Sequence, residues 1–121
     1  MPDRPLHIQT LTGRNALGAV VVQLRGAADL SSEPALERAF ADLAADRPDA
    51  VILDLTGLTY LGSPAIGRIV ALWDALRAHN GVLVITNPGP TVRQALDRVR
   101  LSMVIPVIAG LEAPWEALAV A

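Results

Sequence analysis

Residues 50–55 read Ala-Val-Ile-Leu-Asp-Leu, an apolar run with a single polar side chain, Asp54. A run of this length and composition is typical of a β-strand that is buried on both faces of a sheet. Residues 81–86 form a second such run, and a helix-sized segment separates the two. Buried strands with helices between them predict a mixed α/β sheet with right-handed crossovers.

The chain before residue 50 predicts a β-hairpin and a first helix. Residues 6–12 alternate between apolar and polar side chains, and residues 19–25 form an apolar strand after a turn-forming segment. Two such runs in succession are typical of a hairpin. Apolar side chains then recur at helical spacing over residues 33–47, and we expect this helix to end at Pro48.

The chain after residue 55 predicts further helices and strands. We expect a loop at residues 56–62, a helix at 63–79, the buried strand at 81–86, a turn at 87–90, a helix from about 91 to 100, an edge strand at 103–108 and a short helix at 114–120. Thr91 and Gln94 have the spacing of a capping box, and Pro106 favours an edge position for the last strand. The element order is therefore ββαβαβαβα. We expect one α/β domain over residues 1–121, with a mixed sheet, an opening hairpin and helices packed against the sheet.

The composition excludes several classes of protein. The 121 residues include no cysteine and no lysine, and the net charge is −2. A disulfide or thiolate metal site needs cysteine and a P-loop needs lysine, so neither is possible. The arginines are dispersed, so we do not expect direct contact with nucleic acid. No apolar stretch suits a signal peptide or a membrane span, and we expect a cytoplasmic protein. His7 and His79 lack the spacing of metal ligands, so we expect no metal and no cofactor.

Ser63 begins the second predicted helix and is a candidate functional residue with two interpretations. Its surroundings lack both glycines of a nucleophile elbow, because Leu61 and Ala65 occupy those positions, so serine catalysis is not favoured. A serine before Pro64 has the pattern of a helix N-cap. The same position could carry a phosphoryl group, because the positive end of a helix dipole favours an added negative charge.

Two further segments extend a candidate binding surface around Ser63. Gly67, Arg68 and Ala71 fall on the outward face of the second helix, where small side chains would let a partner approach closely. Arg68 could bind a carboxylate of that partner. The high helix propensity of alanine explains much of the same face equally well. Asp29 follows the second strand, where it either caps a turn or adds a charge beside Ser63.

Nearly the whole chain resembles the STAS domain of bacterial anti-sigma-factor antagonists. The resemblance rests on the strand at 51–55, the loop at 56–61, the helix start at Ser63, the segment 80–88 and residues 92–96. The turn from Gly26 to Asp29 is similar to a Gly-x-x-Asp turn of the family. The family also has the order of elements predicted above.

The resemblance implies a function through protein contact and no enzymatic activity. Proteins of this family bind an anti-sigma factor, usually a serine protein kinase of the GHKL ATPase type, and thereby release the sigma factor. Phosphorylation of a serine at the start of the second helix abolishes binding until a phosphatase removes the group, and Ser63 matches that serine. Three neighbouring residues depart from the family motif. Gly62 stands where the motif has Asp, Pro64 where it has Ser or Thr, and Ala65 where it has Gly.

The binding surface implied by the residues and the resemblance together has seven members. They are Asp29, Gly62, Ser63, Pro64, Gly67, Arg68 and Ala71. An alternative is a STAS adaptor that uses the same surface without phosphorylation, as a subunit of a larger signalling or transport assembly. An enzyme acting through Ser63 is the third and weakest hypothesis.

Overall fold

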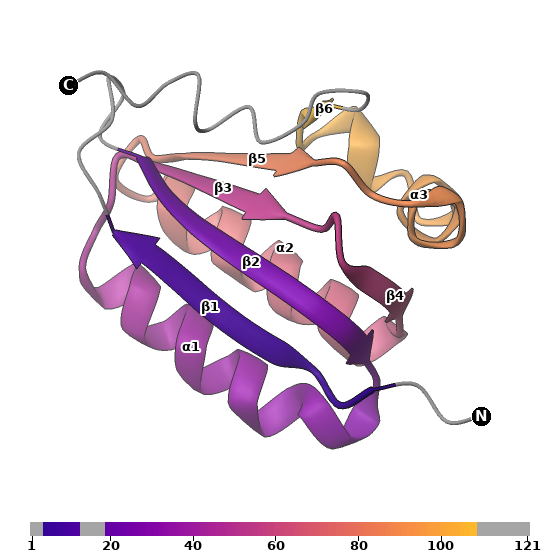
Figure 1. Cartoon of the computed structure of the whole chain (residues 1–121). Helices are drawn as coiled ribbons and strands as arrows, with labels where there is room; N and C mark the ends of the chain where they lie inside the picture. The colour runs from indigo at the N-terminus through magenta and orange to yellow at the C-terminus, as the bar shows by residue number, and fades with distance from the viewer. Residues whose placement is uncertain (1–3, 13–18, 109–121) are drawn as a thin grey trace, which may run out of the picture.

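The computed structural model describes residues 4–12 and 19–108, and within them it has a mixed β-sheet with helices on one face (Figure 1). The elements are β1 (His7–Thr12), β2 (Ala19–Ala28), the 3₁₀ helix η1 (Leu30–Ser32), α1 (Glu33–Ala45), β3 (Ala50–Asp54), β4 (Leu58–Leu61), α2 (Ser63–Arg77), β5 (Val82–Thr86), α3 (Pro90–Arg98), the 3₁₀ helix η2 (Leu101–Met103) and β6 (Val107–Ile108). The predicted α/β class is therefore confirmed.

The strand order is β1-β2-β3-β5-β6, and β4 pairs with β2 outside this row. β1 and β2 are antiparallel, whereas β2, β3, β5 and β6 run parallel. The predicted hairpin is confirmed by the antiparallel pair β1–β2, and the two predicted buried strands are β3 and β5, which lie side by side with Val51 opposite Leu83. The apolar runs of these strands are continuous because the middle of the sheet is buried.

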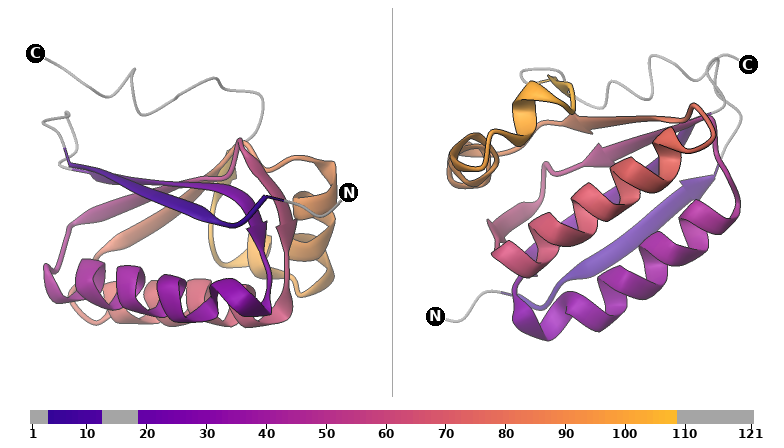
Figure 2. Two further views of the ribbon diagram at one scale, coloured as in Figure 1. Left: turned by 60° about the horizontal axis from the view of Figure 1, so that its bottom comes forward. Right: turned by 180° about the vertical axis from the view of Figure 1, so that it is seen from behind.

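α1 and α2 pack on the same face of the sheet, and the left view of Figure 2 shows them lying together below it. The core between the layers is aliphatic, with Leu36, Leu72 and Leu76 on the helices and Leu53 and Ile85 on the strands, all buried. Burial of each such side chain contributes about 1.5–3 kcal/mol. α3 packs elsewhere, against β4.

The segment 58–61 forms strand β4, where the sequence predicts a loop. β2 changes partner at Gly26, whose φ is 93°. Before Gly26 the strand pairs with β3, and beyond it the strand pairs with β4, so that Ala28 lies opposite Leu61. Four residues, two of them exposed, leave too little periodicity in the sequence to identify such a strand.

The start of α3 also differs from the prediction. The helix begins at Pro90 with Gly89 as its N-cap, and no side chain caps it. The prediction of a capping box at Thr91 and Gln94 is therefore wrong. Proline at the first helical position supplies the required φ instead.

The bounds of the remaining helices and strands agree approximately with the predictions. α1 and α2 each end two residues earlier than expected, at Ala45 and Arg77. The last strand does lie at the edge of the sheet, but it spans only Val107–Ile108, because a 3₁₀ helix occupies Leu101–Met103. The helix predicted at 114–120 lies outside the described residues.

Candidate functional site

The carboxyl ends of β2 and β4 bring Asp29 and Ser63 to the same end of the sheet. Ala28 and Leu61, the last residues of the two strands, lie opposite one another. The Gly62 N–H donates a hydrogen bond of 2.9 Å to the Ala28 carbonyl. The segments that carry Asp29 and Ser63 therefore leave the sheet side by side.

Ser63 is the first residue of α2, and its side chain is exposed. The N-cap is Gly62, which is extended with φ −87° and ψ 165°, and no side chain caps this helix. The interpretation of Ser63 as the N-cap is therefore wrong. Gly62 takes that place because its N–H bonds Ala28 while its carbonyl accepts the first bond of the helix, from Ile66 N–H at 3.1 Å. Pro64 follows and has no N–H to be capped.

Asp29 has the turn-capping role that the sequence predicts. One of its carboxylate oxygens accepts hydrogen bonds from the N–H and the hydroxyl of Ser31, at 3.0 and 2.5 Å. Its carbonyl accepts a bond of 2.7 Å from the hydroxyl of Ser32. Asp29 is exposed despite these bonds, so it also adds a negative charge to the surface beside Ser63.

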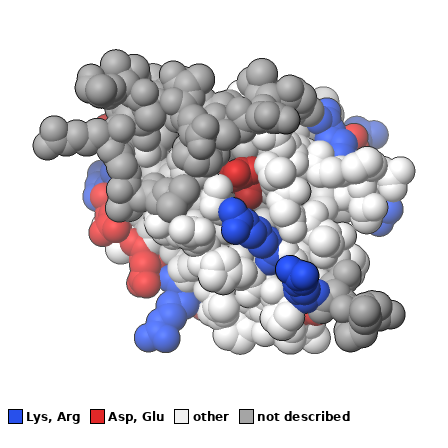
Figure 3. Space-filling model, viewed as in Figure 1, with Lys and Arg blue, Asp and Glu red and all other residues white. Residues whose placement is uncertain are grey.

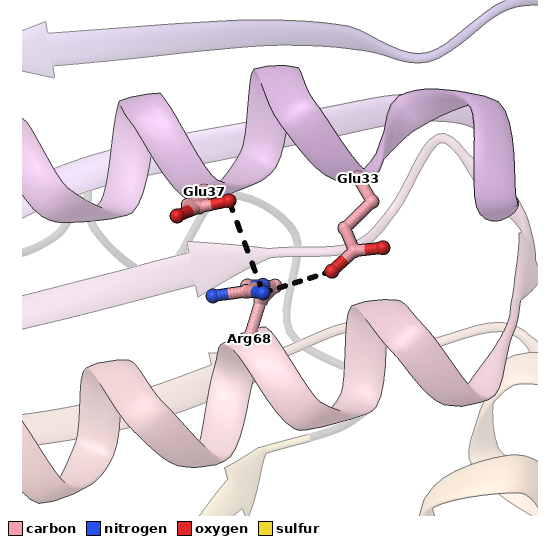
Figure 4. A network of polar contacts seen from close by, with 3 residues as sticks. All are labelled: Glu33, Glu37 and Arg68. Atoms are coloured by element: carbon pink, nitrogen blue, oxygen red, sulfur yellow. Dashed lines mark hydrogen bonds and ion pairs between the residues drawn. The ribbon is translucent and has the colours of Figure 1, made fainter.

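Arg68 points from α2 across to α1, where it meets two carboxylates (Figure 4). Its guanidinium lies 2.8 Å from a carboxylate oxygen of Glu33 and 3.9 Å from one of Glu37. The hydrogen bond to Glu33, with a further contribution from Glu37, raises the pKa of Arg68 against the opposing effect of burial. Arg68 therefore already has carboxylate partners within the chain, and its contact with another protein stays a prediction.

The outward face of α2 is smooth beside Arg68. Gly67 and Ala71 are both exposed, and a Cβ added to Gly67 would meet no atom within 4 Å. A shallow groove of about 210 Å³ separates this face from α1. Its lining includes Glu37, Phe40, Ala41, Ala44, Arg68, Ala71, Leu72 and Ala75. The predicted small-residue face thus borders the junction of the two helices.

A second groove, of about 260 Å³, lies beside Ser63 between β4, the first turns of α2 and α3. We call it the Ser63 groove, and its lining is Tyr60, Leu61, Gly62, Ser63, Ile66, Thr91, Gln94, Ala95, Arg98 and Val99. The α3 side of this groove is not predicted by the sequence. No local pattern signals it, because α3 reaches Ser63 only through its packing against β4.

Large apolar side chains are exposed around Ser63. Leu30 is 71% exposed next to Asp29, while Tyr60 and Val99, at the Ser63 groove, are 46% and 51% exposed. Exposed apolar residues close to one another are typical of protein-binding surfaces. The sequence does not single out these residues, since each is an ordinary member of a turn, strand or helix end.

The described residues supply few groups for other chemistry. They contain no cluster of three His, Asp or Glu suited to a metal ion, and no helix among them could cross a membrane. His79 bonds the Pro48 carbonyl at 2.8 Å beyond the far end of α2, and His7 is on β1, so neither contacts Ser63. A cavity of about 630 Å³ between α1 and β1 shares no residue with the Ser63 groove. On the described part of the face in Figure 3, two blue groups lie next to one another near the centre, below a red group, and the other charged side chains are spread along the rim.

Comparison with a family model assigns residues 11–113 to the STAS domain. Among curated proteins, the Anti-sigma-F factor antagonist RsfB of Mycobacterium tuberculosis is 34% identical over 62 residues. That alignment covers 51% of this chain and 51% of the relative, so the match spans about half the length of each protein.

Solved structures share the fold over most of the chain. An anti-sigma factor antagonist from Mycobacterium paratuberculosis has a TM-score of 0.76 and 28% identity, covering 93% of this chain and 94% of its own. Unphosphorylated SpoIIAA has a TM-score of 0.70 and 21% identity, covering 91% of each chain. The phosphorylated form of SpoIIAA from Bacillus has a TM-score of 0.70 and 18% identity, covering 89% of this chain and 95% of its own. At these last two identities the likeness concerns the fold alone.

Proposed function

Because the chain belongs to the STAS domain family, we propose that it is an anti-sigma factor antagonist, which binds an anti-sigma factor and so releases a sigma factor. The name of the mycobacterial relative supports this proposal. The antagonist acts in the cytoplasm as a single domain, by contact rather than by catalysis. The described residues support the last point, because neither histidine of the chain lies beside the Ser63 hydroxyl to act as a base.

Phosphorylation of Ser63 switches this contact. The observation that carries the proposal is an exposed serine that caps no helix, at the first position of α2, beside exposed Leu30 and Tyr60. The anti-sigma factor is itself a serine kinase of the GHKL type. It transfers the γ-phosphoryl group of ATP to the Ser63 oxygen, breaking the bond to the β,γ-bridging oxygen and releasing ADP and the hydroxyl proton. A phosphatase reverses the modification. The added charge blocks an apolar partner surface through repulsion and desolvation.

The contact surface comprises the seven predicted residues together with the exposed apolar ones. Asp29 and Ser63 support it by their adjacency, and Gly67 and Ala71 by their exposure on the neighbouring face of α2. Leu30 contributes apolar area at the same end of the molecule.

The experiment compares Ser63→Asp with Ser63→Ala in binding to the anti-sigma factor that co-purifies with the native protein. We expect Ser63→Ala to bind as the parent does and Ser63→Asp to lose at least tenfold in affinity, measured by titration calorimetry. Gln9→Glu is a matched control, because it adds one negative charge at an exposed position of β1. A Ser63→Asp protein with the affinity of the parent would reject the switch.

Pro64 favours the adaptor as a second candidate. It fixes the backbone next to Ser63, which is already in helical conformation, and a kinase would have to unwind this turn to reach an extended substrate. An adaptor would bind its assembly with the same strength before and after phosphatase treatment. If the protein is instead a switched antagonist, we expect only the unmodified chain to be recovered with the anti-sigma factor.

A further inference from the structure

The Ser63 groove contains one charged side chain, Arg98, among the residues that line it. No aspartate or glutamate of residues 4–12 and 19–108 lines the groove. The remaining polar lining groups are the hydroxyls of Tyr60, Ser63 and Thr91 and the amide of Gln94, which are neutral. An anion placed in this groove would therefore meet one cation and several hydrogen-bond donors, and no carboxylate of the lining would repel it.

Arg98 has no ion pair or hydrogen bond of its side chain with any described residue, and it is exposed at the end of α3. The neighbouring carboxylate, Asp97, is engaged elsewhere. It pairs with Arg93 at 3.4 Å and accepts a hydrogen bond of 3.0 Å from the Ser102 hydroxyl. The carboxylate of Asp29 accepts a hydrogen bond from Ser31, and Asp29 is not among the residues that line the groove. The guanidinium of Arg98 is thus available to a new anion at the groove.

We propose that Arg98 binds the phosphoryl group of phosphorylated Ser63 across the groove. The proposal rests on the switch proposed above and names its internal receptor. The guanidinium N–H groups donate charge-assisted hydrogen bonds to the phosphoryl oxygens, an arrangement that the planar fork of arginine suits. The bridge links α2 to α3 and covers the space between Tyr60 and Val99. Phosphorylation then removes this groove from the partner, in addition to adding charge.

The experiment uses full-length protein in which phosphoserine is incorporated at position 63 during translation. A ³¹P NMR titration measures the second pKa of the phosphate, which is about 6 without a partner. We expect Arg98→Gln to raise this pKa by about half a pH unit, a threefold change in proton affinity, because the bound cation favours the dianion. Arg100→Gln is the matched control, since it removes the same charge two residues further along the chain, at an exposed position that does not line the groove and leaves the Arg93–Asp97 pair intact.

Equal shifts in the two variants, or no shift in Arg98→Gln, would overturn the proposal. Two further measurements guard against a change in folding. Arg98→Lys should keep part of the effect because it keeps the charge, and added salt should raise the phosphate pKa of the parent but not that of Arg98→Gln. A salt response shared by both proteins counts against the bridge.

This test separates the proposal from the proposed function, because no kinase or partner takes part. If phosphorylated protein still binds the anti-sigma factor while the Arg98 effect is present, the switch fails and the bridge stands. If binding is lost on phosphorylation and Arg98→Gln changes nothing, the switch stands and the bridge fails.

Discussion

Gly26 is the residue at which β2 leaves β3 and takes β4 as its partner. Its φ of 93° lies in a region that side chains disfavour. A Cβ at this position would lie 2.5 Å from the Pro5 carbonyl oxygen and 2.8 Å from that of Arg4. Both the dihedral angle and the space therefore require glycine. The pairing of Ala28 that positions the candidate site follows directly after it.

We expect Gly26→Ala to lower the free energy of unfolding by about 1–3 kcal/mol, the usual cost of a strained backbone. Urea denaturation measures the change. Gly67→Ala is the control, because its Cβ would enter open space in the middle of α2, and we expect a gain of about 0.5–1 kcal/mol. Similar stabilities for the two variants would contradict the role assigned to Gly26. A stabilised Gly67→Ala protein that binds the anti-sigma factor less tightly would place Gly67 in the contact.

α1 and α2, which cover one face of the sheet, are joined by polar as well as apolar contacts. α2 buries Ala65, Ile69, Leu72 and Leu76 as one stripe. Beside that stripe Arg68 bridges to Glu33 and Glu37 of α1. Its pKa is raised, so the charge that sustains the bridge is present at all physiological pH values, and deprotonation would remove it only at strongly alkaline pH. The bridge thus fixes α2, which begins with Ser63, against α1.

Arg68→Gln and Glu33→Gln should lower stability slightly and to a similar extent, because each removes one side of the same ion pair. The double variant should lose little more than either single variant, and high salt should reduce all three effects. Denaturant titration of the four proteins measures this cycle. Partner binding then separates two roles of Arg68. If its role is internal, both single variants bind the anti-sigma factor equally, whereas a loss of binding confined to Arg68→Gln indicates a direct contact.

In the molecule as a whole, the candidate site lies at one end of the sheet and outside the core. The turn after β2, the start of α2 and the wall of α3 meet there from distant parts of the chain (Figure 1). A modification at this end changes the surface and its charge while the layers of aliphatic side chains stay intact. The switch proposed for Ser63 therefore acts on binding and not on folding.

Phosphoserine at position 63 should leave the midpoint of thermal unfolding within about 2 °C of the unmodified protein, because its charge meets the favourable end of the α2 dipole. Circular dichroism follows the transition. Ala78→Asp is the opposing control, since it places a negative charge at the exposed C-terminal end of the same helix and should be destabilising. A fall of several degrees on phosphorylation would instead indicate a switch that works by unfolding.

The sequence by itself determined the hairpin, the central strands at 50–55 and 81–86, the three described α-helices and the place of Ser63 at a helix start. Each of these leaves a local trace, because the period of apolar side chains follows directly from the geometry of a strand or helix. The tertiary structure alone decided the pairing of β4 and the partners of Arg68. It also decided the position of Arg98 at the groove beside Ser63. These depend on contacts between residues far apart in the chain, which local periodicity does not record.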